Sequence, residues 1–135
     1  MNNSKFTLVG ILGAIAVAFG ALGAHFLKQK MQIDLLTTDQ LNGFDTGVKY
    51  QIYHVIVMLF LILWSQKTSH KYLVWAYNCF LTGIIMFSGS LYFLCTRNLF
   101  GADWLKALGP ITPIGGLFFI AGWIFIALEI GRAHV

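Results

Sequence analysis

The sequence predicts an all-α membrane protein, an antiparallel bundle of four transmembrane helices. Hydrophobic residues make up 58% of the 135-residue chain and charged residues only 10%, whereas about 25% of the residues in a typical soluble domain are charged. Four long apolar runs follow one another along the chain, and each is close to the roughly 20 residues that a helix needs to cross the hydrocarbon core. The charged residues fall mainly between these runs, as a bilayer requires.

The first apolar run predicts a transmembrane helix over residues 6–27. It contains no formally charged residue, and His25 is its only titratable side chain. Small residues recur along it, among them Gly13, Gly20 and Ala24. Because lipid supplies little hydrophobic drive between helices, small residues that allow close approach favour helix association. We therefore expect this helix to pack against a neighbour through its small-residue face.

The second helix is expected over residues 46–66, after an amphipathic lead-in over residues 37–46. The connection before it is the longest and most polar of the chain. Apolar residues then recur at helical spacing, which indicates that the connection enters the span as a helix: Leu41, Phe44, Val48 and Ile52. Asp45 and Lys49 are four residues apart and can form an ion pair on one helix face.

The third and fourth helices are expected over residues 72–96 and 111–130. The third run is free of charged residues. Pro110 and Pro113 stand at the start of the fourth run, and because proline is favoured at the first helical position, this helix should begin near Ile111 or Pro113. Further small residues are expected to pack these helices against their neighbours: Gly89, Gly115 and Gly116.

The net charge of +4 does not indicate a nucleic-acid-binding protein. The nine basic residues are scattered in ones and twos and form no basic stripe, and in a membrane protein such residues anchor loops to lipid headgroups. The predicted partner is the lipid bilayer; a second membrane protein or another copy of the chain stays open. Four basic residues flank the end that carries the termini and five flank the other end, so the positive-inside rule sets no orientation.

Several polar side chains lie inside the expected spans, where such groups are costly and often functional. The candidate intramembrane cluster contains His25, Tyr50, Gln51, His54, Ser88, Ser90 and Tyr92. One interpretation is a hydrogen-bonded network between helices; the other is a polar cavity for a lipid headgroup, a quinone or another small molecule. No acid–base pairing, nucleophile motif, phosphate loop or zinc spacing accompanies them. The sequence therefore predicts no catalytic residue, no metal and no cofactor, and favours a protein that is not an enzyme.

Haem is the cofactor that the sequence leaves open. Imidazole is a suitable axial ligand, and His25 and His54 lie on neighbouring antiparallel spans. Their depths match only in part, because His25 is roughly 5 Å from the end of its run and His54 roughly 10 Å inside its own. A haem- or quinone-linked redox protein using these histidines is thus the alternative to a binding protein. An oligomeric channel or transporter is a second alternative.

Short motifs along the whole chain resemble one protein family. They are Gly20-Ala21-Leu22-Gly23-Ala24-His25, Phe44 with Tyr50-Gln51 and His54, Phe87-Ser88-Gly89-Ser90-Leu91-Tyr92, and Thr112-Pro113-Ile114-Gly115-Gly116 with Trp123. In this order they resemble domain-of-unknown-function family 423, the small YgdD/YwdK-like integral membrane proteins. The resemblance implies a four-helix protein of the bacterial inner membrane, with relatives in mitochondria. It implies no activity, so the leading hypothesis is a non-enzymatic accessory subunit or a small-ligand or lipid binder.

Overall fold

The computed structural model describes residues 3–134, which form helices joined by short connections. In chain order the helices are α1 (Asn3–Leu22), η1 (Gly23–Leu27), α2 (Lys28–Gln32), α3 (Thr38–Ser65), α4 (Lys71–Gly83), η2 (Ile84–Ser88), α5 (Gly89–Thr96), η3 (Arg97–Leu99), η4 (Asp103–Leu108) and α6 (Ile111–Ala133). They join into four segments long and apolar enough to cross a membrane, namely Asn3–Gln32, Thr38–Ser65, Lys71–Leu99 and Asp103–Ala133. The predicted fold class is confirmed.

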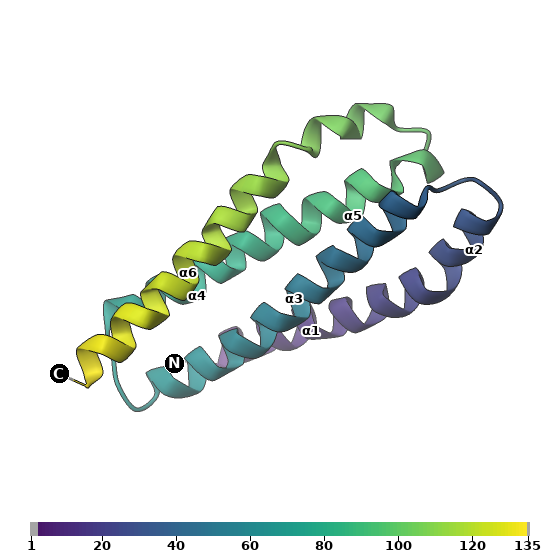
Figure 1. The fold of residues 1–135 in the computed structure, drawn as a ribbon. Coiled ribbons are helices and arrows are strands. Elements are labelled where there is room, and N and C mark those ends of the chain that lie inside the picture. The colour runs from purple at the N-terminus through teal and green to yellow at the C-terminus, as the bar shows by residue number, and fades with distance from the viewer. Residues whose placement is uncertain (1–2, 135) are drawn as a thin grey trace.

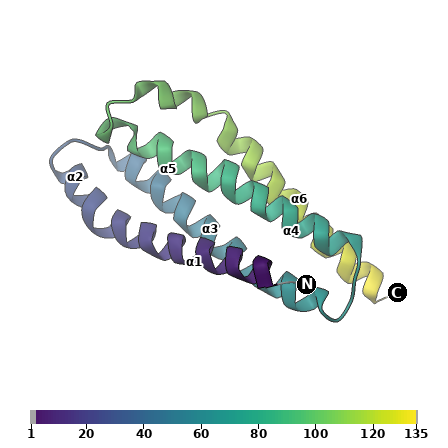
Figure 2. The same cartoon turned by 180° about the vertical axis from the view of Figure 1, so that it is seen from behind.

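The four segments run antiparallel, and both termini lie at the same end of the bundle (Figure 1). Viewed from behind, the two connections over residues 33–37 and 100–102 lie at the same end of the bundle, opposite the termini (Figure 2). α1 packs on α3, α3 packs on η2 and α5, and α6 packs on α4 and η2. The bundle therefore consists of a first hairpin (α1 to α3) and a second hairpin (α4 to α6), joined through α3.

The starts of α3, α4 and α6 have local causes. Thr37 and Gln40 form a capping box at the start of α3, in which each backbone N–H donates to the other's side-chain oxygen, at 2.9 and 3.1 Å. The His70 side chain caps α4, and α6 begins at Ile111, directly after Pro110. Two single π-helical turns, η1 and η2, interrupt the first and third segments, and such turns bend the helix locally.

The buried side chains form two clusters. The larger cluster joins all four segments and includes Val9 on α1, Met58 on α3, Phe80 on α4 and Phe119 on α6. The smaller cluster lies towards the 33–37 connection, and its fully covered members are Leu27, Leu36, Phe44 and Cys95. The first segment is the most exposed, since 11% of its most apolar window is buried, against 44% for the third segment. It therefore forms the edge of the bundle with the most surface for lipid.

Packing contacts show which residues share a level along the bundle. Gly20 faces the Val48 side chain, and the Ser88 hydroxyl donates to the Gly47 carbonyl oxygen. The 33–37 connection and the connection between the third and fourth segments lie at the end of the bundle opposite the termini (Figure 1). We call this end the cap; it contains η1, α2, the first turns of α3, the end of α5, η3 and η4.

Candidate functional site

A groove of about 400 Å³ lies between α3 and α6. Most of its wall is apolar or aromatic, with Phe87, Pro113 and Phe119 among the lining residues, and its polar side chains come from Tyr50, His54 and Trp123. Grooves of this size and composition are typical of small-molecule sites, which combine apolar walls with a few polar groups. Two residues of the predicted polar cluster, Tyr50 and His54, therefore line one cavity.

His54 is a fixed part of the groove wall. Its ring is 4% exposed and stacks on Phe119, with centroids 3.8 Å apart. Nδ1 lies 2.6 Å from the Tyr50 carbonyl oxygen, and Nε2 accepts from the Trp123 indole N–H at 3.1 Å. Because an indole nitrogen can only donate, Nδ1 carries the imidazole proton in this arrangement. Both ring nitrogens are thus occupied, and neither is free to bind a metal or to take up a substrate proton.

Tyr50 differs from His54 in having a free polar atom. The residue is 41% exposed, and its ring packs on Phe87 with centroids 4.9 Å apart. Within residues 3–134, no hydrogen-bond partner of its hydroxyl group is found. A hydroxyl on an apolar surface gains free energy when it finds a partner. The hydroxyl group is consequently available to a ligand in the groove.

Gln51 and Tyr92 form a separate, internal polar contact. Gln51 is 2% exposed; its Nε2 donates to the Leu12 carbonyl oxygen at 2.7 Å, and its Oε1 accepts from the Tyr92 hydroxyl at 2.6 Å. This chain of bonds joins α1, α3 and α5. It satisfies buried polar atoms within the protein, which is how buried groups avoid the cost of desolvation.

The two serines of the cluster also connect helices. The Ser88 hydroxyl donates to the Gly47 carbonyl oxygen on α3 at 2.7 Å. The Ser90 hydroxyl lies 2.5 Å from the Thr112 hydroxyl on α6 and donates to the Phe87 carbonyl oxygen at 3.0 Å. Both side chains thus have protein partners: Ser88 connects η2 to α3, and Ser90 connects α5 to α6.

His25 lies apart from the rest of the predicted cluster. It is exposed on η1, and its imidazole has no hydrogen bond to any residue in the range 3–134. Gly23 on the same turn faces Phe44, which precedes His54 by ten residues, or about 15 Å along α3. The structure therefore does not bring His25 and His54 together, and the pair does not fit a shared haem iron.

The glycines expected to pack helices differ in the space around them. A Cβ atom at Gly115 would overlap the Phe87 backbone. At Gly13 and Gly20 it would lie 3.4 Å from a valine side chain, which is ordinary contact. The remaining positions have more open surroundings: Gly89, Gly116 and Ala24. These contacts favour Gly115 as the packing position most sensitive to substitution.

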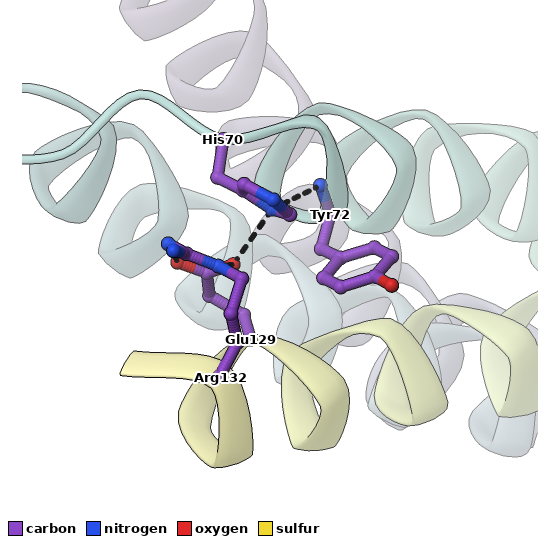
Figure 3. Close-up of polar contacts among 4 residues, drawn as sticks. All are labelled: His70, Tyr72, Glu129 and Arg132. Carbon is purple, nitrogen blue, oxygen red and sulfur yellow. Dashed lines mark hydrogen bonds and ion pairs between the residues drawn. The ribbon is translucent and has the colours of Figure 1, made fainter. Parts of the chain in front are cut away.

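Sequence reasoning missed one charged cluster, at the end of the bundle that carries the termini (Figure 3). The Glu129 side chain is 0% exposed and lies between Arg132, at 2.5 Å, and His70 Nδ1, at 2.9 Å. The Glu129–Arg132 spacing of three residues could have indicated half of it. His70 is the N-cap of α4, so the cluster links the start of α4 to the end of α6 through ion pairs.

Comparison with known proteins gives one consistent result. Residues 19–116 match the family described as a protein of unknown function, DUF423. A UPF0382 membrane protein of Haemophilus influenzae is 38% identical over 94% of this chain and 93% of its own length. A UPF0382 membrane protein of Staphylococcus aureus is 39% identical over 91% of this chain and 92% of its own length.

The inner membrane protein YgdD of Escherichia coli, also of UPF0382, is 34% identical over 89% of this chain and 85% of its own length. No solved structure matches the chain. The integral membrane location predicted from the sequence is confirmed by the four apolar segments and by these membrane relatives. This chain belongs to the DUF423 family of uncharacterised membrane proteins, the family that its motifs resemble.

Proposed function

We propose that this protein is a non-enzymatic membrane protein that binds an amphiphilic small molecule, with a polar head and an apolar tail, in the groove between α3 and α6. The observation that carries the proposal is the free Tyr50 hydroxyl in a groove whose other walls are aromatic and apolar. The bacterial inner membrane, named for the E. coli relative, would supply such ligands. An accessory subunit of a larger complex would use the groove in the same way.

The distribution of polarity along the groove supports an amphiphile. With the span 46–66 as reference, Tyr50 lies near the membrane surface, and His54 lies about 6 Å deeper along α3. Phe119, Ile120 and Trp123 form the deeper wall. A ligand with its polar head near the membrane surface and its apolar part towards the bilayer centre has the same order of groups.

The rigid aromatic wall of the groove favours a ligand with a flat head group. His54 and Phe119 stack at an interplanar angle of 10°, and the Trp123 hydrogen bond holds the imidazole in place. Aromatic rings pair favourably in offset or edge-to-face arrangements, so a quinone ring is a suitable head. Its carbonyl oxygen could accept from the Tyr50 hydroxyl, without any electron transfer by the protein.

The test uses the purified protein in nanodiscs and a short-chain benzoquinone as the probe, with quenching of tryptophan fluorescence as the readout. Because one hydrogen bond contributes about 0.5–1.5 kcal/mol, Tyr50→Phe should weaken binding by about two- to thirteenfold. Tyr53→Phe is the matched control, since Tyr53 is exposed on the same helix and lies outside the groove lining. Trp123→Phe should remove much of the quenching.

Two outcomes would overturn this assignment. Equal binding by the wild type, Tyr50→Phe and Tyr53→Phe would show that the probe only partitions into the bilayer. Quenching that persists in Trp123→Phe at unchanged amplitude would place the probe elsewhere on the protein. A bound lipid retained in native mass spectra and lost in Tyr50→Phe alone would support the same groove with a lipid as its occupant.

A further inference from the structure

We propose a second binding site, for a phosphate group, in a crevice of about 280 Å³ between the first helical segment and α3. The crevice lies at the cap, and its lining shares no residue with the groove between α3 and α6. It is therefore independent of the ligand proposed for that groove.

The crevice exists because one of its walls has almost no side chains. Gly20, Gly23 and Ala24 form the wall on the first segment. Phe19 and Phe44 lie beside them, and their rings pack at a centroid distance of 5.9 Å. Small residues alone leave a hollow that lipid or water could fill. The charged and polar groups at its rim make the hollow more suitable for a phosphate than for an apolar ligand.

The charges at the rim leave one cation without a partner. Lys28, Asn42 and Asp45 line the crevice. Asp45 Oδ2 lies 2.8 Å from Lys49 Nζ, so its charge is matched within α3. Lys28 Nζ has no ion-pair partner, and the Asn42 side chain has no hydrogen bond, within residues 3–134. A lysine ammonium beside a free amide donor is a suitable pair for a phosphate oxygen.

The position of the crevice indicates where the phosphate comes from. Phe44 and Asp45 directly precede the expected span 46–66, so the rim lies at the level of the lipid headgroups. Cationic side chains at this level attract anionic lipids, with about 1 kcal/mol for each lysine near the surface. A phospholipid could place its phosphate at Lys28 and its glycerol region against the phenylalanine rings. A free phosphate ion would use the same cation.

The experiment compares retention of phosphatidylglycerol by native mass spectrometry after nanodisc reconstitution. Lys28→Gln should retain about fivefold less lipid than the wild type. Lys30→Gln is the matched control, because Lys30 lies two residues along the same helix with its Nζ 5.0 Å over the Phe26 ring, outside the crevice lining. Ala24→Leu, which fills the hollow without changing charge, should lower retention as well.

A parallel titration with inorganic phosphate in lipid-free detergent separates the two sources. Weakened phosphate binding in Lys28→Gln, with unchanged lipid retention, would support the site with a soluble phosphate as its ligand. Equal losses in Lys28→Gln and Lys30→Gln would show general attraction to positive charge and would overturn the site. Unchanged retention and unchanged phosphate binding in both Lys28→Gln and Ala24→Leu would overturn it too.

Discussion

Where α4 and η2 meet α6, glycines bring one helix against the backbone and rings of the other, whereas α1 and α3 meet through side chains. A Cβ atom at Gly115 would overlap the Phe87 backbone, and one at Gly83 would lie 2.5 Å from the Phe119 ring. In the first hairpin, Gly13 and Gly20 face valine side chains at 3.4 Å. The contacts at Gly83 and Gly115 in the second hairpin therefore leave no room for a methyl group, whereas those at Gly13 and Gly20 in the first hairpin do.

The difference shows that small residues permit close packing without ensuring it. The first segment is rich in glycine and alanine, yet it is the segment with the least buried surface. What decides the contact is how closely the opposite residue approaches. In the first hairpin, a Cβ atom at Gly23 would lie 3.3 Å from the Phe44 ring, whereas in the second hairpin one at Gly83 would lie 2.5 Å from the Phe119 ring and one at Gly115 would overlap a backbone. The open seam of the first hairpin also leaves space for the crevice near Lys28.

The largest effect is expected for Gly115→Ala. The added methyl group would overlap the backbone of η2, which cannot move as a side chain can, and overpacking of this kind costs about 1–3 kcal/mol. We expect the free energy of unfolding in detergent to fall by an amount near the upper end of that range. Gly116→Ala is the control, because its Cβ would lie 3.8 Å from the Phe87 ring and should change stability little. Equal effects at the two positions would contradict a backbone contact at Gly115.

Much of the fold could be predicted from the sequence, because a bilayer constrains a chain through hydropathy and helix length. The four apolar runs predict four helices, and Pro110 with Pro113 predicts the start of α6, which begins at Ile111. The two π-helical turns could not be predicted, since Gly23 and Ile84 stand in apolar runs that look like any other helix. Which helix lies beside which also depends on contacts distant in sequence.

The candidate site could be predicted only as a set of residue types. Polarity alone singles out His54 and Gln51, but it cannot show that one lines the groove and the other binds Tyr92 internally. Both lie on α3 three residues apart, and their partners come from different helices. His70 and Glu129 were missed for the same reason, because 59 positions separate them in the chain.

A smaller effect is expected where the two hairpins join. Gln51→Leu removes the partners of the Leu12 carbonyl and the Tyr92 hydroxyl, and leaving buried groups unpaired costs about 1–3 kcal/mol. Interhelical hydrogen bonds in a bilayer average about 0.6 kcal/mol each, so we expect a total loss near 1 kcal/mol. Tyr92→Phe should cost less, because it removes only one of the two bonds.

The double variant of Gln51 and Tyr92 tests whether the bond couples the hairpins. If the hydroxyl and the amide interact, the combined loss should be smaller than the sum of the single losses, with a coupling of about 0.5 kcal/mol or more. Strictly additive losses would show that the two side chains act independently. Thr7→Val is a control for a polar substitution on α1, because its hydroxyl donates within its own helix, to the Asn3 carbonyl oxygen.

The smallest effect is expected for Gly20→Ala in the first hairpin. The added methyl group would lie 3.4 Å from Val48, which is ordinary van der Waals contact, and alanine removes a glycine penalty of roughly 0.5–1 kcal/mol in a helix. Unfolding in detergent should therefore show no loss of stability, and a gain of at most roughly 0.5–1 kcal/mol. Gly10→Ala, with no atom within 4 Å of its Cβ, reports the helix preference alone. A loss of stability at Gly20 as large as that at Gly115 would mean that α1 cannot move to accommodate the methyl group. This result would contradict the difference between the two hairpins.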